Sequence, residues 1–207
     1  MIELLNCDCM EYMATLPDKA FDLAIVDPPY GIMENGGQSG GCVGHLKDRI
    51  FNEFMRAGSE WDKAPDKTYF DELFRISQNQ IIWGGNYFEL PISRCWIVWD
   101  KCQPWLNFSQ VELAWTSFNK PTGLFKFDNR TGDKIHPTQK PIALYKWLLK
   151  TYATADMKII DTHLGSGSSA IAAYDFGCEF VGMEIDKDYY DAAVKRFNIY
   201  KMQTKLF

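Results

Sequence analysis

The sequence predicts an α/β protein built on a doubly wound, mainly parallel sheet. Short apolar segments rich in β-branched residues alternate along the chain with segments of helical periodicity, the pattern that gives βαβ units. Acidic residues and a glycine loop follow several of these apolar segments, and open α/β sheets bind their ligands at the carboxyl ends of strands. The 207 residues are enough for a substantial core, so we expect 1–207 to form a single domain.

The first 32 residues predict a strand, a short helix and a second strand. We expect the helix over Cys9–Thr15, and the second strand over the apolar run Leu23–Val26. Residues 33–60 then lack an apolar pattern, and Gly36–Gly41 is too flexible and too poor in apolar side chains to pack by itself. A loop of this length in a compact domain is typically a lid or a binding loop, so we predict a lid-like loop over 33–60.

Strands and helices alternate again through the rest of the chain. Pro141 suits the first position of a helix, and Gly177 suits the left-handed residue that ends one. The expected elements are, in chain order, a helix over Thr68–Ser77, strands over Gln80–Gly84, Cys95–Trp99 and Val111–Trp115, a helix from Pro141 to about Ala153, a strand over Met157–Asp161, a helix over Ser168–Phe176, a strand over Glu179–Met183 and a helix from Lys187 to about Tyr200.

Composition places the chain among ordinary globular proteins, with 46% hydrophobic and 24% charged residues. Charges or prolines interrupt every apolar run before it could cross a bilayer, and the N-terminus lacks the pattern of a signal peptide. We therefore expect a cytoplasmic protein with no membrane partner. The six cysteines have no C-x-x-C spacing and the three histidines lie far from them, so we expect reduced thiols and no metal site.

Charge is unevenly distributed along the chain. The net charge of −5 argues against broad, nonspecific affinity for nucleic acid. The stretch from Phe118 to Lys146 nevertheless has a net charge of +4, because six basic side chains stand there against two acids. A solvated loop explains such a cluster most simply, and contact with phosphates is the functional alternative. The six are Lys120, Lys126, Arg130, Lys134, Lys140 and Lys146.

The motif Asp27-Pro28-Pro29-Tyr30 directly follows the predicted strand over Leu23–Val26. Neither proline can donate a ladder hydrogen bond, so the strand stops there, and the residue before each proline is held in extended geometry. The motif therefore presents a carboxylate, carbonyls without a competing N–H, and a phenol ring at the carboxyl end of a strand. Such a corner suits a flat ring with an exocyclic amine, because the oxygens accept from the amine and the tyrosine stacks on the ring.

A second motif, Asp161-Thr-His-Leu-Gly-Ser-Gly-Ser-Ser-Ala170, lies between a predicted strand and a predicted helix. Gly165 and Gly167 permit a tight turn with close approach of a ligand, and Glu184 ends the next strand, where a carboxylate can accept from ribose hydroxyls. The pattern also matches the dinucleotide fingerprint, so a nicotinamide-dependent oxidoreductase is an alternative. Asp161 would repel the phosphates of a dinucleotide, and the one strand and one helix after this loop are too little for the second half of a dinucleotide-binding fold. Both observations favour a nucleoside that carries an amine and a sulfonium.

Together these motifs resemble the S-adenosylmethionine-dependent amino methyltransferases of DNA, of the circularly permuted β-class. In that class the Asp-Pro-Pro-Tyr motif comes first and the glycine loop comes last, which is the order here. The resemblance covers most of the chain and implies the Rossmann-like methyltransferase fold in its circularly permuted form. The matching segments are Asn6–Cys9, Asp27–Tyr30, the highly specific His136–Pro141, Asp161–Gly167 and Gly182–Asp186.

The resemblance implies transfer of a methyl group from S-adenosylmethionine to the exocyclic amine of a base flipped out of DNA, as in DNA methylation and restriction-modification. Asp27, Pro28, Pro29 and Tyr30 would be catalytic, with Asp27 and the Pro28 carbonyl accepting from the amine and Tyr30 stacking on the base. The resemblance also assigns residues to the cofactor. Asp8 and Cys9 would lie near its adenine and Glu184 on its ribose. Its methionine part would lie beside Asp161, Gly165, Ser166, Gly167 and Ser168, with His136, Thr138 and Lys140 near the carboxylate, and Asp27 would also contact the cofactor.

The acid in Asp27–Tyr30 is associated with adenine N6, so adenine is the expected base and cytosine N4 is the alternative. Methyltransferases of RNA or of protein amides more often have asparagine there, and the net acidity argues against a non-catalytic DNA-binding module. Thr162-His163 and Ser169 depart mildly from the usual glycine-loop motif. Residues 116–135 leave little room for target recognition, so we expect a reduced recognition segment, with a homodimer or a partner subunit supplying further grip on DNA.

Overall fold

The computed structural model describes residues 1–31, 63–103, 109–128 and 139–204. Its centre is an eight-stranded sheet with the order β1-β8-β7-β2-β3-β5-β4-β6. β5 runs antiparallel to its neighbours β3 and β4, and the other pairs of strands are parallel, so the predicted mainly parallel sheet is confirmed. The strands are β1 (Ile2–Leu5), β2 (Phe21–Val26), β3 (Ser77–Trp83), β4 (Trp96–Asp100), β5 (Val111–Thr116), β6 (Gly123–Lys126), β7 (Lys158–Asp161) and β8 (Glu179–Met183).

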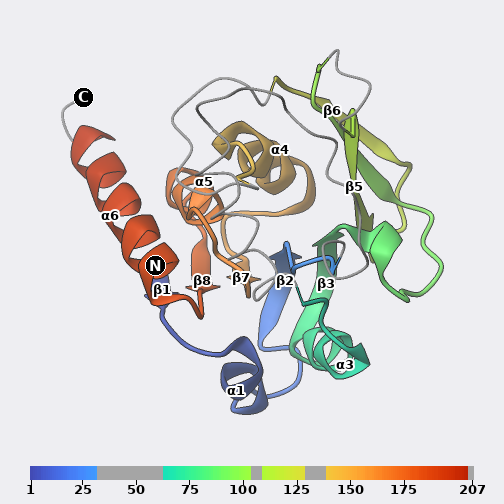
Figure 1. The fold of residues 1–207 in the computed structure, drawn as a ribbon, viewed down its shortest axis with the longest axis horizontal. Helices are drawn as coiled ribbons and strands as arrows, with labels where there is room; N and C mark the ends of the chain where they lie inside the picture. The colour runs from blue at the N-terminus through green and yellow to red at the C-terminus, as the bar shows by residue number, and fades with distance from the viewer. Residues whose placement is uncertain (32–62, 104–108, 129–138, 205–207) are drawn as a thin grey trace, which may run out of the picture.

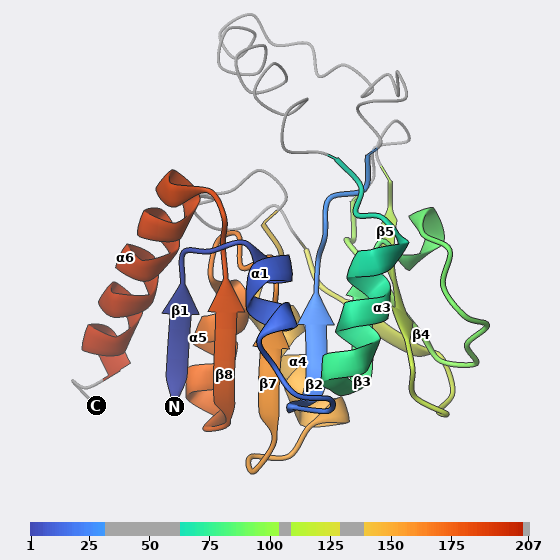
Figure 2. The same cartoon turned by 90° about the horizontal axis from the view of Figure 1, so that it is seen from below.

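Helices cover both faces of this sheet, as Figure 1 shows. Helices α1 and α3 lie on one face, and α4, α5 and α6 lie on the other (Figure 2). This is the doubly wound arrangement that the alternation of elements predicts. The helices are α1 (Cys9–Ala14), α3 (Lys67–Ile76), α4 (Ile142–Tyr152), α5 (Ser168–Phe176) and α6 (Lys187–Thr204), with a short 3-10 helix, η1 (Gly85–Tyr87), directly after β3.

Each face of the sheet has its own hydrophobic core. Successive side chains of a strand point to opposite faces, and in β2 Leu23 and Ile25 join the core beneath α4 and α5. Ala24 and Val26 join the core beneath α1 and α3. A central strand covered on both sides is therefore apolar at consecutive positions, which is why this segment reads as a continuous apolar run.

The order of strands reverses between β7 and β2. From β2 the chain passes through α3 to β3 on one side, and from β7 it passes through α5 to β8 on the other side. The two strands pair in parallel through Leu23 with Ile159 and Ala24 with Ile160. In open α/β sheets the carboxyl ends of the strands at such a reversal are the usual place for a ligand.

Most predicted elements are present, with shifted ends. Helix α5 and strand β8 have the predicted bounds, and Gly177 ends α5 with a φ of 84°, as expected. The prediction that Pro141 is the first helical residue is wrong, because Pro141 has extended geometry and caps a helix that begins at Ile142. The predicted helix end at Ser77 is also wrong, because β3 already begins at that residue.

Strand β6 is an element that the sequence pattern did not predict. It lies within the segment 116–135 that we expected to serve target recognition, and it pairs in parallel with β4 through Gly123 opposite Ile97. Its four residues alternate between intermediate and high exposure, so they lack the apolar pattern that marks a buried strand. The predicted lid-like loop over 33–60 and residues 129–135 lie outside the described residues.

Candidate functional site

Acidic residues stand at the carboxyl ends of four neighbouring strands. Asp8 follows β1, Glu184 follows β8, Asp161 ends β7, and Asp27 follows β2. These four strands are adjacent and mutually parallel, so their carboxyl ends share one edge of the sheet. The structure thus brings together the acids predicted for the cofactor and the acid predicted for catalysis.

Asp27 lies where the strand order reverses, with both carboxylate oxygens engaged. The Tyr30 hydroxyl donates to Oδ1 at 2.6 Å, and the Lys140 ammonium contacts Oδ2. Nζ of Lys140 also lies 3.3 Å from the Tyr30 hydroxyl oxygen. Burial and the nearby Asp27 carboxylate raise the pKa of Tyr30 well above its ordinary value, so the phenol keeps its proton and acts as a donor.

The Tyr30 ring is held between aromatic neighbours and a glycine. It stacks on Tyr87, with ring centroids 5.1 Å apart and 18° between the planes, and Phe88 meets its edge at 6.1 Å. A Cβ on Gly84 would come within 2.2 Å of the Tyr30 ring, so this glycine makes the room that the ring occupies. Tyr87 is 52% exposed, and the stacked pair therefore borders solvent, where a flat ring could reach it.

Lys140, predicted near the cofactor's methionine carboxylate, here contacts two carboxylates. Besides Asp27, its Nζ lies 3.2 Å from Oε2 of Glu112, and Lys101 reaches the other oxygen of Glu112 at 2.5 Å. The Lys140 side chain is only 3% exposed. Burial by itself would lower the pKa of Lys140, but the two carboxylates raise it above its ordinary value, so the ammonium stays charged.

The glycine loop between β7 and α5 has the backbone that its sequence predicts. Gly165 and Gly167 have φ angles of 50° and 74°, in the left-handed region that glycine adopts without strain. Arg196 of α6 holds the loop by donating to the Ser166 carbonyl at 2.8 Å and to the Ser168 hydroxyl at 3.0 Å. The two serine hydroxyls lie 3.1 Å apart and are buried, so these predicted site residues fix the loop with their side chains.

Glu184 is turned toward this loop. Its Oε2 accepts from the Gly165 N–H at 2.9 Å, and its Oε1 accepts from the Asp186 N–H at 3.0 Å. Burial raises the pKa of Glu184 above its ordinary value. Asn6, which follows β1, donates to the Glu184 carbonyl at 2.8 Å and so ties the end of β1 to the end of β8.

Asp161 is fully buried beside the same loop. Its Oδ1 accepts from the His163 N–H at 3.0 Å, and its Oδ2 accepts from the Ser169 hydroxyl at 2.6 Å. Burial raises the pKa of Asp161 to about 7, and the nearby Asp27 adds to the rise. Near neutral pH this carboxyl is therefore present in both its neutral and its ionised form.

The residues that depart from the usual glycine-loop motif, Thr162, His163 and Ser169, lie in hydrogen-bond networks with their neighbours. The Tyr69 hydroxyl of α3 lies 2.6 Å from the Thr162 hydroxyl, which lies 2.9 Å from Nδ1 of His163. Burial lowers the pKa of His163 to about 4, so its imidazole is neutral at physiological pH. Thr162 and His163 thus anchor the start of the loop to α3.

Asp8 and Cys9, predicted beside the cofactor's adenine, form the start of α1. Asp8 caps this helix, since its Oδ1 accepts from the Met10 N–H at 2.6 Å. Burial and the neighbouring Asp8 raise the pKa of Cys9 to about 12, so its thiol stays protonated. The cap fixes where Cys9 stands relative to the end of β1.

Two predicted site residues, His136 and Thr138, lie outside the described residues. The structure also brings in residues that the sequence pattern did not single out: Gly84, Tyr87, Lys101, Glu112 and Arg196. The pair Gly84-Gly85 at the end of a strand was an available signal, because glycine there often marks a close approach of other groups. Charged residues such as Glu112 gave no signal, since their partners are distant in the sequence.

The basic stretch from Phe118 to Lys146 does not form a single positive surface among the described residues. Lys140 is buried, and Lys146 pairs with Asp175 at 2.5 Å. Lys120 donates to the Thr151 carbonyl at 3.2 Å, so it caps the end of α4. Arg130 and Lys134 lie in the part of the chain that is not described.

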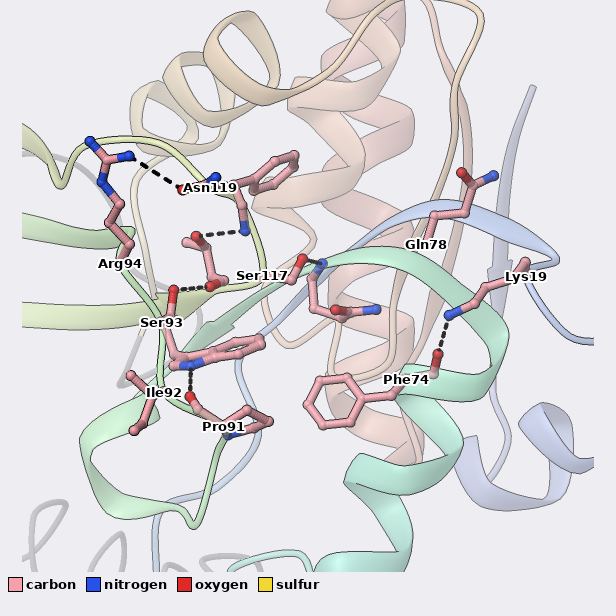
Figure 3. A pocket seen from close by; sticks show the side chains of 13 residues that line it. Lys19, Phe74, Gln78, Pro91, Ile92, Ser93, Arg94, Ser117 and Asn119 are labelled. Carbon is pink, nitrogen blue, oxygen red and sulfur yellow. Dashed lines mark hydrogen bonds between the residues drawn. The ribbon is translucent and has the colours of Figure 1, made fainter.

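A cavity of about 560 Å³ lies at the opposite end of the sheet and is drawn in Figure 3. It is lined by residues that precede β2 and β4 and follow β5. Its cations hold the fold: Lys19 donates to the Phe74 and Ser77 carbonyls at 2.7 and 2.9 Å, and Arg94 donates to Asn119 at 3.4 Å. The acidic edge is therefore the better candidate site.

Within the described ranges, the structure has no group of three or more histidine, cysteine or acidic side chains that could hold a metal ion. Across those same ranges, none of the helices combines the length and the apolar character needed to span a bilayer. The thiols of Cys7, Cys9, Cys95, Cys102 and Cys178 are free.

Comparison with known proteins finds similarity to methyltransferases of DNA. A profile described as DNA methylase matches residues 115–195. The type II methyltransferase M.HinfI of Haemophilus influenzae is 26% identical over 250 aligned residues, which cover 93% of this chain and 67% of that protein. The methylase YubD of Escherichia coli is 22% identical over 223 residues, which cover 95% of this chain and 90% of its own length.

Solved structures share the fold over nearly the whole chain. M1.HpyAVI, determined in complex with S-adenosylmethionine, has a TM-score of 0.61 at 21% identity and covers 96% of this chain and 100% of its own. The DNA modification methylase TTHA0409 of Thermus thermophilus, also complexed with S-adenosylmethionine, has a TM-score of 0.59 at 17% identity. The match covers 97% of this chain and 94% of that structure. The cytosine-N4-specific PvuII DNA methyltransferase has a TM-score of 0.62 at 14% identity, and the match covers 95% of this chain and 86% of that structure.

The fold is therefore the Rossmann-like methyltransferase fold, as the sequence predicts. The resemblance to the S-adenosylmethionine-dependent amino methyltransferases of DNA is likewise confirmed, by the family profile and by curated relatives that align with more than nine-tenths of the chain.

The contact between Gly84 and Tyr30 leads to a first prediction. Gly84→Ala places a methyl group into the Tyr30 ring and also strains a left-handed residue with a φ of 67°. Gly177→Ala is the matched control, because Gly177 has a φ of 84° with nothing within 4 Å of the added Cβ. We expect the control to lose about 1–2 kcal/mol in the free energy of unfolding, and Gly84→Ala to lose clearly more.

The excess cost at Gly84 should disappear when Tyr30 is already alanine, because the ring is what the new methyl group meets. Chemical denaturation of the two single variants and the double variant measures this coupling. Additive costs for Gly84→Ala and Tyr30→Ala would show that the glycine does not serve to seat the ring.

Proposed function

We propose that this chain transfers a methyl group from S-adenosylmethionine to the exocyclic amine of a base in DNA, with adenine N6 as the first candidate. The main support is the juxtaposition of two half-sites at the β7–β2 reversal. One half-site joins Asp27 to Tyr30 and suits an amine on a flat ring. The other is the glycine loop between Asp161 and Glu184, and it suits a nucleoside with a cationic side chain. A methyl donor and its acceptor would then lie side by side.

The residues around the glycine loop fit S-adenosylmethionine. The left-handed Gly165 and Gly167 let a ligand approach the backbone closely. The carboxylate of Glu184 faces the loop and has lone pairs left for ribose hydroxyls. A cationic ligand beside the buried Asp161 would favour its ionised form, whereas a pyrophosphate would meet a negative charge there. The bound cofactor supplies an electrophilic methyl group on its sulfonium.

On the acceptor side, Asp27 would exchange one partner for another. Its Oδ1 now accepts from the Tyr30 hydroxyl. As Tyr30 turns its face to the base, that oxygen becomes available to an amine N–H, and the Pro28 carbonyl takes the second N–H. Two acceptors draw the amine nitrogen toward tetrahedral geometry and localise its lone pair. Positioning of the two reactants then supplies much of the acceleration, and a paired base has to leave the duplex first.

The choice of adenine rests on the acid at the first position of Asp27–Tyr30. Cytosine N4 presents the same amine geometry, and one solved relative in fold is cytosine-N4-specific. Incubation with labelled S-adenosylmethionine and unmethylated genomic DNA, followed by sequencing of modified bases, identifies the base and its sequence context. Label in N4-methylcytosine alone would replace adenine in this proposal, and the absence of label in DNA would refute the proposed activity.

We further propose that the chain acts as one catalytic domain with few recognition elements of its own. Residues 33–60 would close over the DNA strand, and 116–135 would form a reduced recognition segment. A homodimer would supply further contact with DNA, because the described part of that segment contains a short edge strand, β6, whose exposed cation, Lys126, lies 3.8 Å from Asp100.

Removal of the Asp27 carboxylate should abolish methyl transfer. We expect Asp27→Ala to lower kcat by at least about a hundredfold, in the range seen when a positioned polar group of a reaction centre is removed. Cofactor affinity, measured by calorimetry, should change much less than kcat, because most residues assigned to the cofactor lie on the other side of the reversal, around the glycine loop. Asp191→Ala, which removes an exposed acid of α6, serves as the control, and near wild-type transfer by Asp27→Ala would contradict the assigned role.

The raised pKa of Asp161 predicts that cofactor binding depends on pH. At pH 6 most of this carboxyl is neutral, and a cationic ligand that favours the ionised form must release up to one proton. The affinity for S-adenosylmethionine should therefore fall as the pH drops from 8 to 6. Calorimetry in buffers of different ionisation enthalpy measures the released proton, and Asp161→Asn should show no such release.

The same carboxyl should also affect the stability of the protein without cofactor. A raised pKa contributes stability below the ordinary pKa, near 4, and that contribution is lost as the pH rises through about 7. Relative to Asp161→Asn, the wild type should thus lose up to about 1.4 kcal/mol of unfolding free energy per pH unit across this window. Parallel curves for the two proteins would contradict the shift.

A further inference from the structure

A line of alternating charges leads from the antiparallel part of the sheet to Asp27. Lys101, which follows β4, pairs with Glu112 of β5 at 2.5 Å. Glu112 lies 3.2 Å from Nζ of Lys140, and Lys140 contacts Oδ2 of Asp27. The side chains of all four are between 3% and 25% exposed. The resemblance and the motifs account for Asp27 and Lys140, but they assign no role to Glu112.

The four charges of this line cancel one another. A buried ion pair is stable only where the loss of hydration is offset by close partners, and Lys140 has two carboxylates for this purpose. Burial would raise the pKa of Glu112, but Lys140 and Lys101 hold it below its ordinary value, so Glu112 is ionised. Glu112 therefore stands as a permanent negative charge on the far side of Lys140 from Asp27.

This second carboxylate changes what Lys140 does to Asp27. If Asp27 were the only partner of this lysine, the ammonium would offset much of the negative charge of the Asp27 carboxylate and weaken the carboxylate oxygens as acceptors. With Glu112 on the opposite side, the positive charge of Lys140 is offset, while its N–H still fixes Oδ2 in place. The other oxygen, Oδ1, then keeps its strength as an acceptor when the Tyr30 hydroxyl leaves it.

We propose that Glu112 is a positioning residue for the transfer reaction, which holds Lys140 on Oδ2 of Asp27 and offsets its charge. The inference rests on the proposed function, because Asp27 is its point of action. Among the described residues, the ionisable groups that interact with Asp27 or Glu112 also include Tyr30, Tyr69, Tyr145 and Asp161. Burial raises the pKa of the three tyrosines well above the ordinary value, so they stay neutral and leave the charges of the line unchanged. Asp161 is on the cofactor side of the reversal.

Glu112→Gln tests the proposal, because it keeps the shape of the side chain and removes its charge. We expect kcat for DNA methylation to fall at least about tenfold, which corresponds to about 1.4 kcal/mol in the barrier. The KM for DNA and the dissociation constant of S-adenosylmethionine should stay within about twofold. Glu72→Gln is the matched control: Glu72 is a partly buried partner of Arg75 outside this line, and its substitution should leave kcat unchanged.

Two further variants separate positioning from a merely structural role. Glu112→Asp keeps the charge and should recover most of kcat, although it shortens the side chain. In a Lys140→Gln background, Glu112→Gln should cause no further loss of kcat, because there is no lysine left to offset. Thermal unfolding of each variant identifies any that fail to fold, and Glu112→Asp keeps the test open if Glu112→Gln is one of them.

Wild-type kcat in a folded Glu112→Gln protein would overturn the inference and leave the proposed function intact. An additive loss in the double variant would also overturn it, because Glu112 would then act independently of Lys140. If the wild-type protein methylates neither adenine nor cytosine in DNA, the proposed function fails first. The wild-type assay therefore distinguishes the two failures.

Discussion

The parallel pairing of β2 with β7 is the contact on which the site depends. It joins a strand near the start of the chain to one near the end, through Leu23 with Ile159 and Ala24 with Ile160. Because both strands run the same way, their carboxyl ends meet, and the residues that follow them become neighbours. The two motifs that the sequence keeps far apart are thereby placed on the two sides of one reversal.

That arrangement concentrates negative charge at one edge of the sheet, and each acid is stabilised in a different way. Asp27 is paired with a lysine that a second carboxylate also contacts. Glu184 accepts from two backbone N–H groups. The hydrogen-bond partners of Asp161 within the described part of the chain include no cation, and its pKa rises to about 7 instead. An edge of this kind is suited to a ligand that carries a positive charge, as the methyl donor proposed for the glycine-loop half of the site does.

Sequence reasoning succeeded where the signal is local. The apolar run before Asp27, the glycines of the loop and the helix end at Gly177 each depend on the residue's own geometry or on its immediate neighbours, and the structure has them as expected. It failed where the outcome depends on packing. Strand β6 has partly exposed residues and exists because β4 offers it an edge. The wrong start of α4 is a different case, because proline suits both the cap and the first helical position, and Pro141 has the extended backbone of a cap.

By itself, the sequence determined the alternation of strands and helices, the two motifs and their order, and so the family that the chain resembles. These are properties of short segments, in which the chemistry of proline, glycine and acidic side chains acts over a few residues. Only the tertiary structure decided that Lys140 contacts Asp27, that Glu112 and Lys101 lie behind it, and that Gly84 makes room for Tyr30. Such contacts join residues from different strands and loops, and no local pattern encodes them, because they follow from which strands become neighbours in the sheet.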